Sequence, residues 1–96
     1  MARKRWFLVT YDVRDPKRLR RCAKQLKGYG SRIQYSVFRC RLTEREVEQM
    51  RWELNKLLKE EDDVLIVGLC DGCARRVRVR SPRVDWLSND VEFEIV

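Results

Sequence analysis

Apolar and charged residues alternate along this chain with spacings that predict successive strands and helices. The first segment, from Trp6 to Asp12, is rich in aromatic and β-branched residues, which suit a buried or half-buried strand. It closes on Asp12, a charge that costs free energy at the mouth of a sheet unless water, a partner or a cation compensates it. Asp15 and Pro16 then predict the N-cap and first residue of a helix.

A basic helix is predicted from Pro16 to about Lys27, because apolar residues recur there at helical spacing. The apolar stripe consists of Leu19, Cys22, Ala23 and Leu26. The other faces carry Lys17, Arg18, Arg20, Arg21, Lys24 and Lys27. Few acids separate these bases, which favours a nearby anion, although a solvated helix surface explains them equally well. We expect Gly28 and Gly30 to end the helix, as residues that tolerate positive φ.

A second strand is predicted over Arg32–Leu42, where Ile33, Tyr35 and Val37 alternate with other residues. Thr43 and Glu46 then have the spacing of a capping box. They introduce a second helix that ends near residues 59–62. Its apolar stripe consists of Val47, Met50, Leu54, Leu57 and Leu58.

The run from Val64 to Cys70 predicts a strand that is apolar on both faces, so both faces must be covered. Helices cover only one face of a small sheet, and a second copy of the chain is the simplest cover for the other. The predicted fold is therefore α+β: a ferredoxin-like βαββαβ domain over residues 1–72, homodimeric, with a short strand paired to residues 38–42. Residues 73–96 are predicted to form a C-terminal basic segment and an additional terminal strand.

Charge and composition narrow the classes of function. Lys and Arg outnumber Asp and Glu by 22 to 15, which gives +7 per chain and 2 × 7 = +14 per dimer. A polyanion such as nucleic acid is the natural partner, although a merely soluble basic surface fits equally well. Histidine is absent, so a hydrolase would depend on carboxylates or a metal-activated water. No apolar run reaches the roughly 18 residues of a membrane span, and we expect a cytoplasmic protein without membrane contact.

The motif Cys70-Asp71-Gly72-Cys73 has the spacing of half a zinc site or of a redox pair. Two dimer-related copies would supply four thiolates. No helix start is evident after the motif, and the simpler interpretation, two ordinary thiols at a strand end and turn, is favoured.

The order of these segments resembles a known family. Tyr11-Asp12-Val13 closes the first strand, Arg32-Ile33-Gln34-Tyr35-Ser36-Val37-Phe38 follows the basic helix, Leu42-Thr43 starts the second helix, and Asp63 opens an apolar strand. In this order and spacing the chain resembles, over about residues 6–70, the small CRISPR-associated endoribonucleases, the second core protein of CRISPR adaptation. The resemblance implies a ferredoxin-like homodimer whose last strand crosses to the partner's sheet.

The resemblance also implies a site. Asp12 matches the family's metal-binding aspartate, two symmetry-related copies of which bind Mg²⁺ between them, and it is the implied catalytic residue. Tyr11, Arg32, Ser36 and Phe38 match supporting positions around it, and Arg21 matches a basic position of the first helix. A second basic position falls on Leu19, between Arg18 and Arg20, so which of these touches phosphate stays open. The predicted nucleic-acid-binding residues are Arg14, Lys17, Arg18, Arg20, Arg21 and Arg32.

Two functions therefore remain open. The first is a CRISPR adaptation protein that acts as a homodimeric, magnesium-dependent endonuclease on single-stranded RNA, double-stranded DNA or both. The second is a non-catalytic dimeric scaffold that holds the protospacer duplex and docks the CRISPR adaptation integrase. From the residues alone, the simpler interpretation of Asp12, a strand-end residue that caps a turn or pairs with Arg14, is favoured. Only the role of Asp12, catalytic or not, distinguishes the nuclease from the scaffold.

Overall fold

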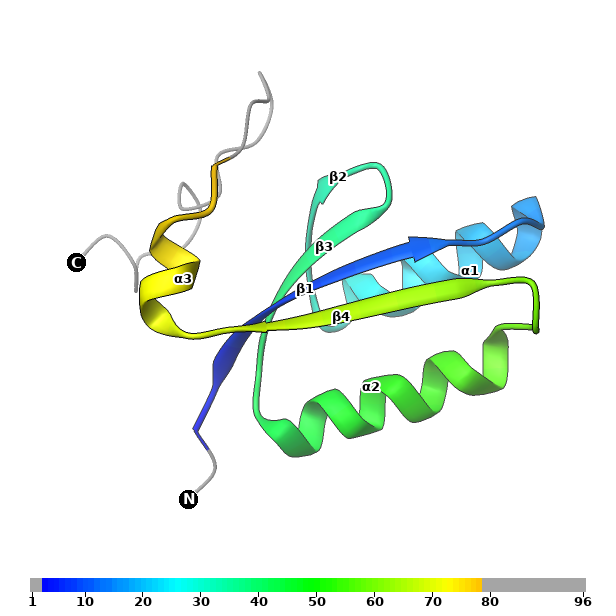
Figure 1. Ribbon diagram of the computed structural model, residues 1–96. Helices are drawn as coiled ribbons and strands as arrows, with labels where there is room; N and C mark the ends of the chain where they lie inside the picture. The colour runs from blue at the N-terminus through cyan, green and yellow to red at the C-terminus, as the bar shows by residue number, and fades with distance from the viewer. Residues whose placement is uncertain (1–2, 79–96) are drawn as a thin grey trace.

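The computed structural model describes residues 3–78, which form a four-stranded antiparallel sheet with helices packed on it (Figure 1). The elements are β1 (Arg5–Asp12), α1 (Pro16–Lys27), β2 (Gly30–Gln34), β3 (Val37–Leu42), α2 (Glu44–Leu57), β4 (Asp63–Leu69) and α3 (Asp71–Arg75). The strand order is β2-β3-β1-β4, and each neighbouring pair is antiparallel. This order confirms the ferredoxin-like α+β prediction.

The main core lies between the sheet and the two long helices, α1 and α2. Alternate residues of β1, including Phe7 and Val9, face these helices, as do Phe38 and Cys40 of β3. The helices contribute apolar side chains such as Cys22, Ala23, Leu26, Val47, Met50 and Leu54. Every second residue of the strands and one stripe of each helix therefore form a single core layer between the sheet and the helices.

Both predicted helix starts are confirmed. The Asp15 carboxylate accepts a hydrogen bond from the backbone N–H of Arg18 at 3.0 Å, and Pro16 is the first helical residue. At α2 the Thr43 hydroxyl accepts from the N–H of Glu46 at 3.1 Å, while the N–H of Thr43 donates to the Glu46 carboxylate at 2.8 Å. Each cap satisfies backbone donors that the first helical turn leaves free.

The short strand predicted to pair with residues 38–42 is confirmed as β2, but the prediction of one continuous strand over Arg32–Leu42 is wrong. The chain reverses at Tyr35 and Ser36, so that β2 and β3 form a hairpin with a register irregularity between Arg32 and Gln34. The prediction that Gly30 ends the helix is also wrong, and neither it nor Gly28 has a positive φ. Gly30 belongs to β2, where a Cβ would collide with the carbonyl oxygen of Arg39.

A short helix, α3, starts directly after β4, contrary to the prediction that no helix begins at the cysteine motif. Its Ala74 is buried with Trp6 and Ile33 on the sheet face that α1 and α2 leave open. Further along this face, Leu65 and Val67 of β4 are 59% and 38% exposed. The predicted C-terminal strand lies outside the described residues. Among the described helices, none has the length and apolar content that crossing a bilayer requires.

Candidate nucleic-acid and metal site

Asp12 is the last residue of β1, and its side chain lies on the open face of the sheet. Tyr11, its neighbour, is buried in the main core, so strand alternation directs Asp12 to the other side. Asp12 pairs in register with Asp63, the first residue of β4, which lies on the same face. Both residues are exposed, and within residues 3–78 neither carboxylate has a hydrogen bond or an ion pair. Two like charges directly opposite on neighbouring strands repel unless a cation lies nearby.

A basic groove of about 420 Å³ lies at the same end of the sheet but on the helix side. Residues of β1, α1 and the β2–β3 hairpin line it: Tyr11, Leu19, Arg20, Ala23, Lys24, Lys27, Arg32 and Tyr35. The Tyr35 ring is 70% exposed, and the Arg32 guanidinium lies 5.9 Å from its centroid. An exposed aromatic ring with four surrounding cations suits a nucleotide, whose base stacks while its phosphate pairs with Arg or Lys.

Three predicted supporting residues hold the hairpin against the end of β1. The Tyr11 hydroxyl donates to the backbone carbonyl of Tyr35 at 3.1 Å, and the Tyr11 N–H donates to that of Ser36 at 3.2 Å. Burial raises the pKa of Tyr11, so its hydroxyl stays protonated and donates at neutral pH. Phe38 is fully buried, with the Arg32 guanidinium 5.4 Å from its ring. Tyr11, Ser36 and Phe38 thus position Arg32 and Tyr35 beside the groove.

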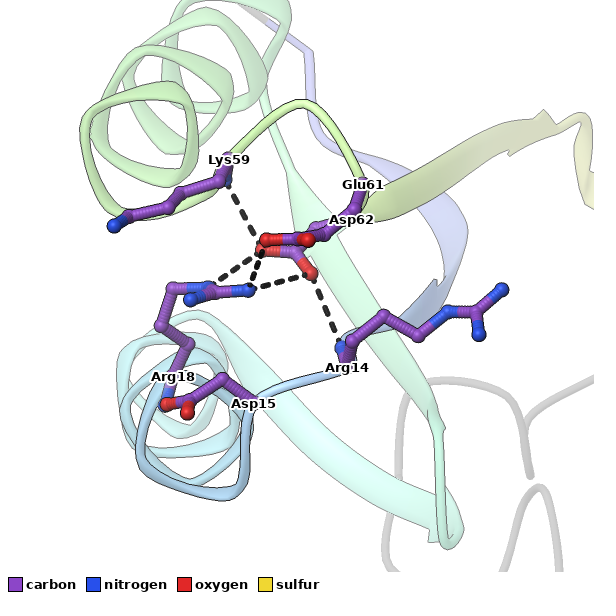
Figure 2. Close-up of polar contacts among 6 residues, drawn as sticks. All are labelled: Arg14, Asp15, Arg18, Lys59, Glu61 and Asp62. Atoms are coloured by element: carbon purple, nitrogen blue, oxygen red, sulfur yellow. Dashed lines mark hydrogen bonds and ion pairs between the residues drawn. The ribbon is translucent and has the colours of Figure 1, made fainter.

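Arg18 is held in an ion pair (Figure 2). Its guanidinium donates to Asp62 at 2.8 Å and to Glu61 at 2.9 Å, and its side chain is only 14% exposed. Asp62 also accepts the backbone N–H groups of Arg14 and Lys59, at 3.1 and 3.0 Å. These donors, Arg18 foremost, hold the pKa of Asp62 far below its usual range. The cluster connects α1 to the loop before β4, so the Arg18 guanidinium is already paired with carboxylates of the chain itself.

The other predicted bases fall on different surfaces. Arg20 and Arg32 line the groove, whereas Arg21 lines a separate hollow between α1 and α2. Lys17 is exposed at the start of α1. Arg14 is exposed as well, and Figure 2 shows its side chain directed away from Asp62. The predicted residues therefore do not form one cluster, because Asp12 lies on the sheet face opposite the groove.

The carboxylates at this end of the sheet suit a hard divalent cation. Mg²⁺ prefers oxygen ligands and keeps several waters, so one or two carboxylates are enough to hold it beside a phosphate. One chain offers Asp12 and Asp63 on the same face. In the described part of the chain there is no group of three or more possible ligands, so one chain supplies at most these two carboxylates here. Asp12 and Asp63 therefore fit Mg²⁺.

Two residues of this region escaped the sequence-based site. In the sequence, Asp63 indicates only the start of a strand. Its position opposite Asp12 is known only from the register between β1 and β4. Tyr35 is expected inside a strand, but the hairpin turn exposes it. Recognising a turn at Tyr35-Ser36 would have revealed an aromatic ring at the tip of a basic hairpin.

Comparisons with known proteins agree with this architecture. The family model described as CRISPR associated protein Cas2 matches residues 5–77. The CRISPR-associated endoribonuclease Cas2 of Thermus thermophilus is 43% identical over 65 residues, covering 68% of this chain and 69% of the relative. The protein named CRISPR-associated endoribonuclease Cas2 1 of Chloroflexus aurantiacus is 37% identical over 76 residues, covering 77% and 82%.

Solved structures show the same fold. The crystal structure of Streptococcus pyogenes Cas2 aligns with a TM-score of 0.72 and 36% identity, covering 79% of this chain and 99% of that one. A hypothetical protein from Thermus thermophilus aligns with a TM-score of 0.68 and 40% identity, covering 70% and 83%. The names of the curated relatives confirm the prediction of a nuclease-type enzyme family. The chain belongs to the CRISPR-associated Cas2 family.

Proposed function

We propose that this protein is a homodimeric, magnesium-dependent endonuclease of CRISPR adaptation that cuts phosphodiester bonds in single-stranded RNA, double-stranded DNA or both. One observation carries the proposal: Asp12 presents an exposed carboxylate opposite Asp63 at an end of the sheet rich in bases. Names of curated relatives, endoribonuclease for most and endonuclease for one from Thermus thermophilus, support hydrolysis of nucleic acid.

A second copy of the chain is part of the proposal. Leu65 and Val67 are exposed on the same sheet face as Asp12, and such apolar surface favours burial in an interface. A partner that packs on this face about a two-fold axis passing close to Asp12 would bring the two copies of Asp12 toward each other. Four carboxylates, two from each chain, then surround one position.

Asp12, supported by Asp63, would hold Mg²⁺ there. When bound, the ion supplies a water of lowered pKa and compensates negative charge on the phosphate. The chain's own residues bind and orient the substrate: Arg20 and Arg32 contact backbone phosphates in the groove, and Tyr35 offers its ring to a base. Lys17, Arg14 and Arg21 extend the basic surface around this end. No histidine is needed for this chemistry.

The test is a cleavage assay on single-stranded RNA and duplex DNA, with and without Mg²⁺, using wild type and Asp12→Asn in parallel. The change keeps the side-chain shape and removes the charge, so cleavage should fall to background while folding and dimerisation persist. Glu48→Gln on α2 is the matched control, because Glu48 is an exposed carboxylate paired with Arg51, remote from Asp12 in β1. Robust cleavage by Asp12→Asn would show that Asp12 is not the catalytic residue.

The alternative is a non-catalytic scaffold that holds the protospacer duplex and docks the CRISPR adaptation integrase. One feature favours it: the groove lined by Arg20 and Arg32 lies on the face opposite Asp12, so phosphate binding does not require the carboxylates. The scaffold has no cleavage to lose. It predicts that duplex binding and support of spacer integration persist in Asp12→Asn.

A further inference from the structure

Two of the four cysteines have no part in the proposed nuclease. Cys70 and Cys73 are exposed where β4 passes into α3, whereas Cys22 and Cys40 are buried in the core. Cys70 is the N-cap residue of α3, and its Sγ accepts the backbone N–H of Cys73 at 3.3 Å. The two thiols are therefore held within one helical turn of each other, a spacing at which a disulfide closes with little movement of the backbone.

Cys70 also opens onto a pocket of about 370 Å³. The residues that line the pocket are Arg3, Arg5, Phe7, Glu44, Gly68, Leu69, Cys70 and Asp71. The Arg3 guanidinium lies 3.0 Å from the Asp71 carboxylate, and within residues 3–78 Arg5 makes no ion pair, so Arg5 can receive a carboxylate from a ligand beside the Glu44 carboxylate. The two bases and two acids of the pocket balance in charge, so a small molecule with a carboxylate can pair with Arg5 while it lies beside Cys70.

The thiols differ in reactivity. The hydrogen bond from the Cys73 backbone lowers the pKa of Cys70, so more of its thiolate is present near neutral pH. Its proximity to Cys70 raises the pKa of Cys73. Burial raises the pKa of Cys22 to about 11 and that of Cys40 to about 12, which leaves both unreactive in the folded chain. The core cysteines therefore serve as internal controls.

We propose that Cys70 and Cys73 form a dithiol–disulfide site that exchanges with a small carboxylate-bearing disulfide, with Cys70 as the attacking thiol. The Cys70 thiolate bonds to one sulfur of that disulfide, whose S–S bond breaks and releases one half as a thiolate. Cys73 then loses its proton to water and attacks the Cys70 sulfur, which releases the second half. Two protein thiols are oxidised and one disulfide is reduced to two thiols. The proposal does not depend on the nuclease activity.

The test uses oxidised glutathione as the probe and the full-length chain as the protein. After incubation, maleimide labelling and intact mass should show the loss of two fast-reacting thiols, with no glutathione retained. Cys22 and Cys40 should label only after unfolding. Cys73→Ser should stop at a stable glutathione adduct on Cys70. Cys70→Ser, whose hydroxyl also caps a helix, should react much more slowly.

Three results would overturn the proposal. The first is a lasting glutathione adduct on the wild-type chain, because the second attack would then be absent. The second is equal rates for Cys70→Ser and Cys73→Ser, with circular dichroism showing that both are folded. The third is one tightly held Zn²⁺ per two chains that blocks exchange, since the motif would then be half of a shared thiolate site.

Discussion

Gly30→Ala tests how closely the β2–β3 hairpin, which carries Arg32, packs on its neighbours. A Cβ built at Gly30 collides with the carbonyl oxygen of Arg39 and lies 2.6 Å from the Cys40 sulfur. Neither can retreat easily, because Arg39 lies in β3, an inner strand of the sheet, and Cys40 is fully buried. Overpacking of this kind costs about 1–3 kcal/mol of unfolding free energy.

That cost predicts a measurable shift. For a domain of this size it corresponds to a fall in Tm of roughly 5–20 °C. Gly28→Ala is the control: Gly28 has helical angles, φ −73° and ψ −14°, and its added Cβ meets only the Gln25 carbonyl, at 3.3 Å. Its unfolding free energy should change by less than about 0.5 kcal/mol. Thermal unfolding at one fixed protein concentration measures both variants. A Gly30→Ala protein as stable as the Gly28→Ala control would refute the close packing.

Three further predictions concern charge and assembly. The ion pair with Arg18 lowers the pKa of Asp62, so its stabilisation is complete above the unfolded carboxyl pKa of about 3.9 and is lost as pH falls toward the folded value. The Asp62→Asn variant should therefore have a lower free energy of unfolding than wild type at pH 7, and this free energy should change less as the pH falls. Urea unfolding at a series of pH values measures both proteins, and the same pH dependence for both would contradict the prediction. Duplex DNA binding should weaken by orders of magnitude between low and moderate salt and show little sequence preference, measured by fluorescence anisotropy, because each phosphate contact releases counterions. Leu65→Lys should dissociate the proposed dimer in sedimentation, whereas Trp52→Lys, at a residue of similar exposure on α2, should not. Equal sedimentation of the two variants would show that β4 is not part of a dimer interface.

The helix starts could be predicted because their interactions are local. Asp15 and Thr43 bond to backbone groups three residues away, so the residues that make each cap stand together in the sequence. The start of α3 could not be predicted in this way, since Cys70 caps it with a sulfur and cysteine is not a common N-cap residue. Local rules therefore succeed where the capping residue is one of the usual types.

The position of the hairpin turn was missed because distant residues hold it. Alternation of apolar residues continues through Tyr35 and Ser36, and Ser36 is only a weak turn residue, with no glycine, proline or asparagine beside it to mark a turn. The bonds that hold the turn come from Tyr11, more than twenty residues earlier, through its hydroxyl and its N–H. A contact this distant leaves no sign in the local pattern, so Tyr35 was placed inside a strand and its exposed ring was overlooked.

Asp62 and Asp63 show why neighbouring acids take different parts in the site. In the sequence they are equivalent carboxylates before an apolar strand. In the fold the Asp62 side chain is wholly enclosed, with Arg18 and the N–H groups of Arg14 and Lys59 supplying its donors. Asp63 begins β4 one residue later, faces the open side and stands opposite Asp12. Asp62 therefore holds the loop that leads into β4, the strand whose pairing with β1 places Asp63 opposite Asp12. If the site binds Mg²⁺, Asp62 contributes by holding the loop in place, and Asp63 contributes its negative charge to the ion.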